Sequence, residues 1–313
     1  MTQALRRYWI QIALVAVAVV WGGTFVMVKD AIESYPVFSF LGLRFLIAVV
    51  AFVVLFPRAL RGLTVPLIRV GVIAGLFLCA GYVFQTWGLA GTTASKAAFI
   101  TGMFVVITPV MQAVVLRHVP SWATALGVAS AVIGLWLLSG GSSGGWNVGD
   151  TLVLLCAVAY SAHMIVLGSI GRRHDVLPLT LIQLATTAVV CSAIALATEP
   201  LSAPTDVSVW IALLVTGVIA SAVAFAVQTY AQQHIPPART ALILITEPAF
   251  GGLFGWLAGE ALGLRGLGGA AMILAGMTIA EVVGARAEPE EHVILEPSIE
   301  GPAVPLVEYN EER

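Results

Sequence analysis

The sequence predicts an all-α integral membrane protein with ten transmembrane helices, arranged as two inverted five-helix repeats. Three observations support this fold class: the composition, ten apolar stretches of membrane-spanning length, and a set of residues that recurs about 142 positions along the chain. Of the 313 residues, 59% are hydrophobic and 10% are charged, whereas soluble domains carry roughly 25% charged residues. This composition excludes a soluble enzyme. A net charge of -2 without basic runs also excludes a nucleic-acid-binding protein.

Ten apolar stretches reach the length of about 20 residues that a helix needs to cross the hydrocarbon core of a bilayer. They cover residues 10–28, 36–56, 70–90, 97–116, 121–139, 151–170, 176–198, 207–231, 240–258 and 261–283. Prolines and a glycine-rich run separate them, as expected of turns. The first stretch follows Arg6 and Arg7 but runs on to Trp21 without an obvious cleavage site, so we expect a retained span and not a secretory signal. The short loops leave no room for a water-exposed domain.

The lysines and arginines outside the spans predict the orientation. With ten spans, ten of them fall on the side of the N terminus, and only Lys29, Lys96 and Arg265 fall on the other side. Loops rich in Lys and Arg lie in the cytoplasm, so we expect a multi-pass protein of the cell (inner) membrane with both termini cytoplasmic. Residues 285–313 carry eight glutamates and several prolines, which predicts a disordered acidic cytoplasmic tail.

An internal repeat divides the apolar part of the chain. The matched landmarks are Gln85-Thr86-Trp87 with Gln228-Thr229-Tyr230, Pro36 with Pro178, and the glycine pair Gly127 and Gly134 with Gly269 and Gly276. Each unit would hold five spans, an odd number, so the second copy must insert upside down, as in many transporters. We expect the two repeats at residues 1–140 and 146–284.

Several short motifs lie within the predicted spans. They are Trp21-Gly22-Gly23-Thr24-Phe25, Leu43-Arg44-Phe45, Ala97-Ala98-Phe99-Ile100-Thr101-Gly102, Thr108-Pro109, Glu247-Pro248 and the paired glycines of spans five and ten. In their order and spacing they resemble the drug/metabolite transporter (DMT) superfamily, specifically the ten-span permeases built from two EamA-type repeats. The resemblance implies that the first four helices of each repeat surround a central cavity, with the fifth and tenth at the periphery. It also implies movement of small solutes across the inner membrane, often export of amino acids, nucleosides or drug-like metabolites.

Two ionisable residues lie deep inside predicted spans. At 1.5 Å per residue, Glu247 is about 10 Å and Arg44 about 12 Å from the start of its span. Such groups are costly in hydrocarbon and indicate a solute or proton site. For Glu247 the structural alternative is a carboxylate that caps backbone donors freed at Pro248 or pairs with an arginine. We expect Arg44 to pair with Glu247, with binding of an anionic part of the solute as the alternative. Glu247 is also the candidate for proton coupling.

Other polar and aromatic side chains complete the predicted cavity. The candidates are Trp21, Tyr82, Gln85, Phe99, Thr101, Tyr160, His163 and Gln228. Gln85 and Gln228 occupy matching places in the two repeats, so they either line a wet cavity or bond a neighbouring helix. Trp21, Trp87, Tyr160, Tyr230 and Phe99 could line a cavity for flat or cationic solutes, although aromatic residues in spans also act as packing residues. We expect His163 to bond a backbone carbonyl, with a proton relay as the alternative, and Lys29 and Lys96 to extend to the membrane surface.

The sequence indicates a transporter and not an enzyme. It lacks the motifs of ATP hydrolysis and of intramembrane catalysis, and Asp30, Asp150, Asp175 and Asp206 fall in predicted loops. We expect no cofactor and no metal site, and Cys79, Cys156 and Cys191 lie in apolar stretches as small buried residues.

The predicted activity is secondary transport, in the direction of export, of small metabolites or drug-like solutes by alternating access. A passive channel or facilitator is the first alternative, and an intramembrane enzyme the second. The expected partners are a small solute and the lipid bilayer, without nucleic acid, and the glycines of spans five and ten could support a homodimer.

Overall fold

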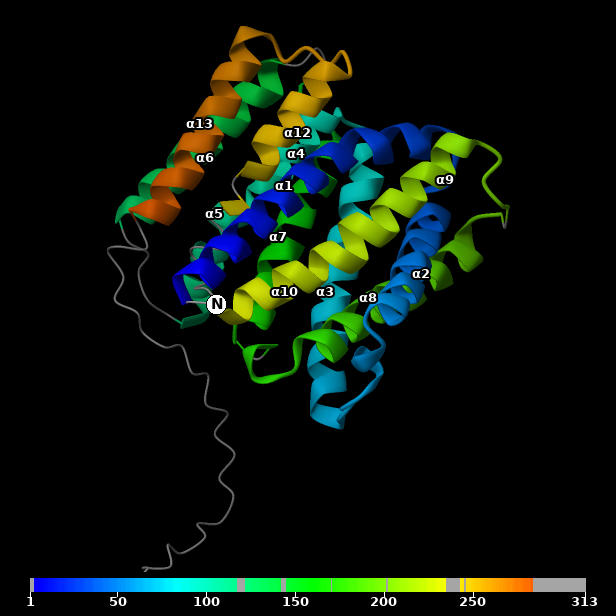
Figure 1. The fold of residues 1–313 in the computed structure, drawn as a ribbon. Helices are drawn as coiled ribbons and strands as arrows, with labels where there is room; N and C mark the ends of the chain where they lie inside the picture. The colour runs from blue at the N-terminus through cyan, green and yellow to red at the C-terminus, as the bar shows by residue number, and fades with distance from the viewer. Residues whose placement is uncertain are drawn as a thin grey trace, which may run out of the picture.

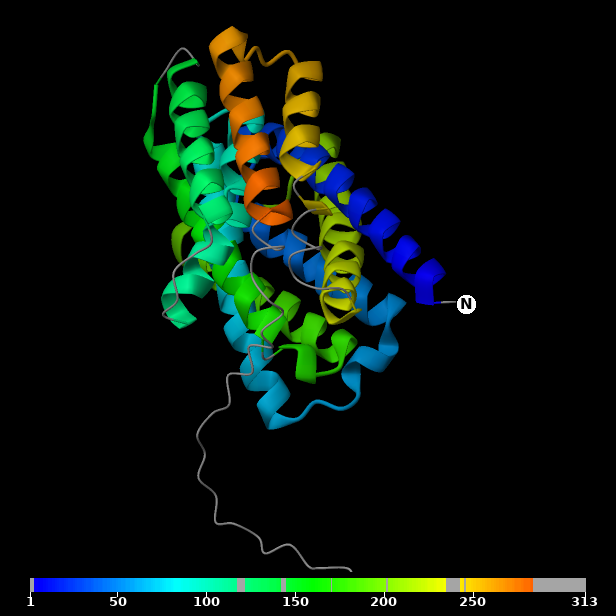
Figure 2. The ribbon, with the colours of Figure 1, turned by 90° about the vertical axis from the view of Figure 1, so that its left-hand side faces the viewer.

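Every predicted span contains helix in the computed structural model, which describes residues 3–116, 122–141, 145–169, 171–200, 202–234, 243–244 and 246–283. In chain order the elements are α1 (Gln3–Ser34), α2 (Val37–Leu55), η1 (Pro57–Leu60), α3 (Val65–Leu89), α4 (Ala94–Gly102), α5 (Phe104–Leu116), α6 (Trp122–Gly141), α7 (Val148–Ser169), η2 (Gly171–Arg173), α8 (Val176–Thr198), α9 (Val207–Leu214), η3 (Val215–Val223), α10 (Ala224–His234), α12 (Thr246–Leu257) and α13 (Gly263–Val282). Within these described ranges the helices form one bundle without strands (Figures 1 and 2). The all-α prediction is therefore confirmed.

Seven described segments are long and apolar enough to cross a membrane. They are Trp9–Ser34, Val37–Leu55, Val65–Leu89, Ala94–Gln112, Val148–Ser169, Val176–Thr198 and Val207–His234. Residues 125–138 of α6 and 263–279 of α13 form shorter apolar helices, and α12 has 12 residues. Part of the span expected at 240–258 and the whole acidic tail at 285–313 fall outside the described residues. A multi-pass bundle is thus supported, whereas the count of ten spans and the inversion of the repeats stay predictions.

Two of the predicted spans are irregular midway along their length. The fourth breaks at Met103, between α4 and α5. The eighth contains η3, a π-helix of 9 residues between α9 and α10. π-Helical turns interrupt the regular i→i−4 pairing of backbone groups and are frequent at functional sites. Here the Ala220 carbonyl of η3 accepts a hydrogen bond of 2.8 Å from the indole Nε1 of Trp21, which joins the eighth predicted span to the first.

Helices α6 and α13 lie side by side on one flank of the bundle (Figures 1 and 2). Their backbones meet at glycines: a Cβ added to Gly134 would lie 2.6 Å from the Gly269 carbonyl oxygen, and one added to Gly276 would lie 2.5 Å from that of Gly127. Small residues permit such close crossings in membranes, so the packing role predicted for these glycines is confirmed. The predicted homodimer through spans five and ten stays a prediction. It would need other faces of α6 and α13, because the glycine faces already meet within one chain.

The crossing of α6 and α13 gives a first testable expectation. Gly269→Ala should lower the free energy of unfolding by about 1–3 kcal/mol, because the new methyl group overpacks a backbone contact. The adjacent Gly268 is the matched control, since an added Cβ there meets nothing within 4 Å. Gly268→Ala should be neutral or stabilising, because alanine favours helix over glycine by about 1 kcal/mol. Thermal unfolding of the purified protein in detergent measures both changes, and equal melting temperatures would contradict the tight crossing.

A buried ion pair joins α4 to α7 at the end of the bundle that the charge distribution predicts to lie outside the cell. Lys96 Nζ lies 2.5 Å from Asp150 Oδ2 and 2.8 Å from the Gly145 carbonyl oxygen. The two charged side chains are 3% and 0% exposed, and the Thr92 hydroxyl and the Asn147 N–H also donate to Asp150. The predictions that Lys96 reaches the membrane surface and that Asp150 lies in a loop are therefore wrong. Asp150 lies in the first turn of α7, where it offers Lys96 a buried partner.

Two further carboxylates occupy helix N termini at the same end. Glu199 accepts hydrogen bonds from two backbone N–H groups at the start of α2, at 3.0 and 2.7 Å. Glu260 accepts from two backbone N–H groups at the start of α4, at 2.7 and 2.8 Å. Carboxylates at these places satisfy free donors and oppose the positive end of the helix dipole. We call these contacts, together with the Lys96–Asp150 pair, the outer-end contacts. Each of them joins the predicted first repeat to the predicted second repeat.

A tyrosine hydroxyl extends the outer-end contacts. Tyr35 donates a hydrogen bond of 2.6 Å to the Ser202 carbonyl oxygen. Burial, and then the negative charge of Glu199, raise the pKa of this hydroxyl. Tyr35 therefore keeps its proton, and its hydrogen bond, throughout the neutral pH range.

Candidate functional site

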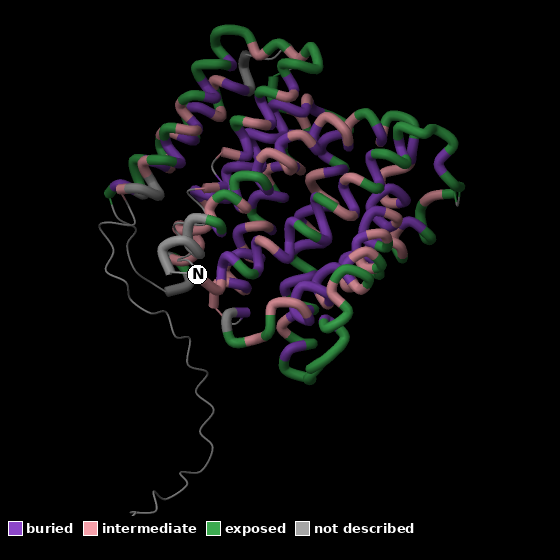
Figure 3. The backbone as a smooth tube through the Cα atoms, in the orientation of Figure 1, coloured by how far each residue is buried: buried purple, intermediate pink, exposed green. Residues whose placement is uncertain are grey.

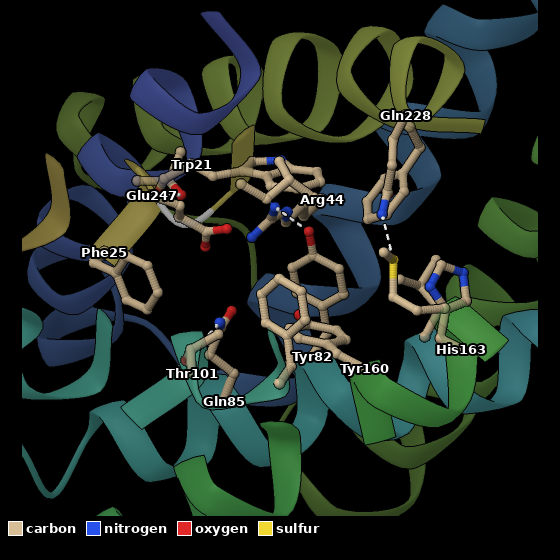
Figure 4. A pocket seen from close by; sticks show the side chains of 16 residues that line it. Trp21, Phe25, Arg44, Tyr82, Gln85, Thr101, Tyr160, His163, Gln228 and Glu247 are labelled. Atoms are coloured by element: carbon tan, nitrogen blue, oxygen red, sulfur yellow. Dashed lines mark hydrogen bonds between the residues drawn. The ribbon is translucent and has the colours of Figure 1, made fainter. Parts of the chain in front are cut away.

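A cavity lies in the middle of the bundle, where buried residues concentrate (Figures 3 and 4). Its volume is about 50 Å³, which is room for a few water molecules and far below the roughly 300–1,000 Å³ of ordinary ligand pockets. The lining residues are Trp21, Thr24, Phe25, Arg44, Leu78, Tyr82, Gln85, Thr101, Phe104, Tyr160, His163, Met164, Phe225, Gln228, Leu244 and Glu247. Nine of the ten residues predicted from the sequence as cavity candidates are among them. The tenth, Phe99, packs instead against Gly252, where an added Cβ would lie 2.8 Å from its ring.

Arg44 reaches the cavity from α2 and is 2% exposed. Its Nε donates to the Ser221 hydroxyl at 3.1 Å, and one terminal nitrogen donates to the Tyr82 hydroxyl at 3.3 Å. The guanidinium carbon also lies 4.5 Å from the centre of the Tyr82 ring, a cation–π contact. These partners are all neutral. Within the described residues, no carboxylate forms an ion pair with the guanidinium.

Glu247 lines the same cavity from the start of α12 and is 6% exposed. Within the described residues, no ion pair or hydrogen bond engages its carboxylate. The predicted Arg44–Glu247 ion pair is therefore wrong, because Ser221 of η3 and Tyr82 of α3 hold the guanidinium instead. The alternative role, capping of donors freed at Pro248, is not found there either. Figure 4 shows the Arg44 guanidinium and the Glu247 carboxyl facing one cavity, so the cavity holds a cationic group and a carboxyl group that do not pair with each other.

The two glutamines of the repeat both face the cavity, and each bonds another helix. Gln85 Nε2 donates to the Thr101 hydroxyl at 3.2 Å, and Gln228 Nε2 donates to the Met164 sulfur at 3.2 Å. The two roles left open by the sequence thus coexist. The buried Oε1 of Gln228 has no partner within the described part of the chain, and an unsatisfied acceptor of this kind is costly. A donor on a bound solute would relieve that cost.

His163 is tied to α8 at the edge of the cavity. Its Nε2 lies 2.7 Å from Oε1 of Gln183, and the same amide donates to the Leu179 carbonyl at 3.2 Å. The histidine is bonded, as expected, but its partner is a side-chain amide and not the predicted backbone carbonyl. Gln183 has 1% exposure and lies on α8, a contact between helices that spacing in the sequence does not reveal.

Aromatic rings form one wall of the cavity. Tyr82 stands edge-on to Tyr160 and to Phe225, with ring centroids 5.7 and 6.1 Å apart, and Trp21 lies 5.5 Å from Phe225. Such offset and edge-on arrangements are those that aromatic pairs prefer. Of the other predicted wall residues, Trp87 is 51% exposed. Tyr230 lines a different cavity at the end of α10.

Several cavity residues were not among the sequence candidates. They are Thr24, Phe25, Leu78, Phe104, Met164, Phe225 and Leu244. All except Thr24 are apolar, and an apolar residue in an apolar span carries no signal of its own. Thr24 and Phe25 belong to the motif that begins at Trp21, and Phe225 precedes Gln228 by three positions and shares its helix face, so these three had a detectable signal.

Gly81 packs directly against the Tyr160 ring that lines the cavity. A Cβ added to Gly81 would lie 2.2 Å from that ring, so Gly81→Ala must displace Tyr160. If the cavity binds a solute, we expect its affinity to fall by about tenfold, equivalent to roughly 1.4 kcal/mol. Gly23→Ala is the control, because its added Cβ would make an ordinary 3.5 Å contact with Phe254. Binding assays over a panel of amino acids, nucleosides and drug-like solutes would measure both variants. Equal affinity would exclude Tyr160 as a wall of the solute site.

The described residues contain no group of His, Cys, Asp and Glu that could hold a metal ion. The three cysteines are buried and unbridged, as small apolar residues are expected to be. The Sγ atoms of Cys79 and Cys191 lie 3.7 Å apart. The polar groups that line the cavity are therefore one guanidinium, one carboxyl, one imidazole, two amides and a few hydroxyls, which suits binding of a small solute.

The sequence of this chain matches a known family of membrane proteins. Residues 8–140 and 147–281 each match the EamA-like transporter family, so the match occurs twice and covers most of the chain. The chain belongs to the EamA-like transporter family. The resemblance noted in the sequence motifs is thus confirmed, and this EamA-like protein is a multi-pass membrane transporter.

The relatives of this EamA-like transporter agree with that assignment. An uncharacterized transporter of Archaeoglobus fulgidus is 32% identical over 252 residues, 80% of this chain and 79% of the relative. The uncharacterized inner membrane transporter YedA of Escherichia coli is 25% identical over 80% of this chain and 83% of its own. The S-adenosylmethionine/S-adenosylhomocysteine transporter of Chlamydia trachomatis is 30% identical over 53% of this chain and 54% of its own. These names describe transporters and not enzymes.

A crystal structure of another protein shows that the fold of this EamA-like transporter is shared. It superimposes with a TM-score of 0.65 at 19% sequence identity, and the match covers 88% of this chain and 98% of the other. At that identity the likeness concerns the fold alone.

Proposed function

We propose that the chain is a secondary transporter that exports small zwitterionic metabolites or drug-like solutes by alternating access. In this proposal ten spans form two inverted five-helix repeats, with both termini in the cytoplasm. The observation that carries the proposal is that Arg44 and Glu247 line one central cavity without pairing. Ionisable groups at membrane depth mark solute or ion pathways. If Arg44 and Glu247 served only to stabilise the fold, we would expect them to form an ion pair with each other.

The cavity chemistry favours a solute that carries both charges. A cationic group would face Glu247 and an anionic group Arg44, while a flat ring would lie against Tyr82, Tyr160 and Phe225. The Chlamydia relative is named for two solutes with an amino-acid group and a flat adenine ring. That chemistry fits the same arrangement, although the relative matches only about half of the chain.

The size of the central cavity supports a mechanism with more than one conformation. About 50 Å³ cannot hold a metabolite, so the helices must separate for a solute to enter. The outer-end contacts hold the repeats together on the external side. At the opposite end a second cavity of about 920 Å³ lies between α1, η1, α8 and α10. We infer a conformation closed to the outside and more open towards the cytoplasm, which is the loading side for export.

Cysteine accessibility tests alternating access against a passive channel. Thr101→Cys, in a chain whose three native cysteines are replaced by alanine, places a thiol in the central cavity. A membrane-impermeant thiol reagent should label it from the cytoplasmic side, and a transported solute should shift labelling to the outer side by about tenfold. A thiol placed at the exposed Val114 is the control that should not respond. Simultaneous labelling from both sides, together with absence of counterflow of labelled solute, would instead indicate a channel.

Proton coupling gives a separate prediction for Glu247. In proteoliposomes with an imposed pH gradient, Glu247→Gln should abolish the acceleration of transport by the gradient, because the amide cannot take up and release a proton. Transport down the solute gradient alone should persist at a reduced rate. Asp206→Asn, which changes an exposed carboxylate without a side-chain hydrogen bond, should leave the acceleration intact. Unchanged gradient dependence in Glu247→Gln would remove Glu247 from the coupling role.

A further inference from the structure

The larger cavity, of about 920 Å³, has walls from four helices. Trp9 and Ala13 of α1, Leu177 of α8, and Val227 and Tyr230 of α10 contribute to the walls, together with Phe56 at the end of α2. Its volume falls within the upper part of the range for ligand pockets, roughly 300–1,000 Å³. Its lining is mainly aliphatic and aromatic, so a polar solute would leave most of the wall uncovered.

Charged side chains stand at the rim of this cavity. Arg58 of η1 and Arg61, which follows η1, are both exposed and both line it, as does Asp175 before α8. Within the described chain, neither guanidinium has an ion pair or a side-chain hydrogen bond, so Asp175 does not neutralise either of them. The rim therefore carries two positive charges against one negative charge, with the donors of both arginines available.

The predicted orientation places this cavity at the cytoplasmic surface of the membrane. The bias of Lys and Arg places the start of α1 and the end of α2 on the cytoplasmic side. Trp9 and Tyr230 are partly exposed there, as expected of aromatic residues at a membrane interface. The apolar wall thus lies at the depth of acyl chains in the inner leaflet, and the arginines lie at the depth of phosphates.

We propose that this cavity binds one anionic phospholipid of the cytoplasmic leaflet. Arg58 and Arg61 donate hydrogen bonds to the headgroup phosphate, and an acyl chain lies against the apolar wall between α1 and α8. Guanidinium groups bind phosphate oxygens strongly, and basic pockets between helices on the cytoplasmic side bind anionic headgroups. A zwitterionic lipid would bring its own cation close to the two arginines, so the site prefers a headgroup with net negative charge. This inference depends on membrane insertion and orientation but not on which solute the chain transports.

The lipid would act on the helix that also lines the central cavity. Phe225 and Gln228 of α10 face the central cavity, whereas Ala226, Val227 and Tyr230 face the larger one. A bound acyl chain therefore packs on the opposite side of the helix that positions Gln228.

Native mass spectrometry of the full chain tests the proposal by measuring bound lipid after mixing with phosphatidylglycerol or with phosphatidylcholine of the same acyl chains. We expect at least about fivefold preference for phosphatidylglycerol, and loss of that preference in the double variant Arg58→Gln/Arg61→Gln. Arg69→Gln is the matched control, because Arg69 is an exposed arginine of α3 at the same end that does not line the cavity. A cavity-filling change, Ala13→Trp, should reduce binding of both lipids. Ala16→Trp, on an exposed part of α1 outside the cavity, should not.

Four results would overturn the proposal. Equal binding of the two lipids, or an undiminished preference in the double arginine variant, would show that the arginines do not select the headgroup. Competition by inorganic phosphate at concentrations similar to those of the lipid would identify a free-anion site without a role for the apolar wall. Binding that occurs only after removal of residues 285–313 would identify the acidic tail as the occupant.

Discussion

Asp150→Asn is expected to lower the free energy of unfolding by about 3–5 kcal/mol, a larger loss than the one expected of Gly269→Ala. Removing one partner of a buried ion pair leaves the other charge uncompensated, and Lys96 is only 3% exposed. The asparagine could still accept from the Thr92 hydroxyl and the Asn147 N–H, so the loss would come mainly from the charge. Thermal or denaturant unfolding of the purified protein in detergent would measure it.

A double variant distinguishes the cost of an unpaired buried charge from other ways in which Asp150→Asn could destabilise the fold. Lys96→Met/Asp150→Leu should recover most of the stability lost in Asp150→Asn, because replacing both charges by apolar residues leaves no ion unpaired. Lys29→Met is the control. Its Nζ lies 4.0 Å from Glu260, its side chain is 27% exposed, and it donates a hydrogen bond of 2.6 Å to the Thr92 carbonyl, so the loss should be about 1–2 kcal/mol, smaller than that of Asp150→Asn. A stable Asp150→Asn protein, or a double variant no better than the single one, would contradict the buried pair.

Arg44→Gln is expected to change the charge selectivity of transport. With the guanidinium removed, Glu247 becomes the dominant charge of the cavity, so zwitterionic solutes should lose about 10- to 100-fold in apparent affinity relative to cationic ones. This range corresponds to roughly 1.4–2.8 kcal/mol. It stays below the Coulomb term of about 4 kcal/mol for two charges 4 Å apart at an effective dielectric of 20. Competition by an amino acid and by its methyl ester, which differ in the anionic group alone, measures the change.

Glu247→Gln provides the opposite arm of the selectivity experiment. It should weaken binding of the methyl ester more than that of an N-acetylated amino acid, which keeps the carboxylate and lacks the cation. Ser221→Ala, which removes one neutral hydrogen-bond partner of Arg44, should cost only a few-fold for all solutes. If Arg44→Gln weakened every solute equally, Arg44 would be a structural residue and the zwitterion proposal would fail.

The charged residues of the cavity could be predicted from the sequence because burying a charge in a membrane span costs free energy. An arginine or glutamate in the middle of an apolar stretch needs a special environment, and repeated glutamines and aromatic motifs gave the neighbouring positions. Nine of ten candidates line the cavity for this reason. The partners of these groups could not be predicted, because Ser221 and Tyr82 reach Arg44 across 177 and 38 residues. Nothing in the sequence distinguishes them from Glu247 as a partner.

The errors at the outer end have a related cause. Lys96 lies near a predicted span end, where a long side chain can normally reach water. Its burial depends on Asp150, which lies 54 positions away and begins α7. At the opposite end, Pro66 is one of the prolines between the predicted second and third spans, yet it occupies the first turn of α3, where its missing N–H is not needed. No pattern in the sequence indicates the π-helix of the eighth predicted span, whose Ala220 carbonyl accepts a hydrogen bond from Trp21 of α1.

The contact of α6 with α13 restricts how the two halves of the molecule can move. One helix of that pair comes from each predicted repeat, and their main chains touch at Gly134, Gly269 and Gly276 without intervening side chains. A crossing this close leaves little freedom to tilt or separate. In the proposed mechanism we therefore expect any rearrangement that admits a solute to take place among the remaining helices, with this pair as the fixed pivot about which they turn.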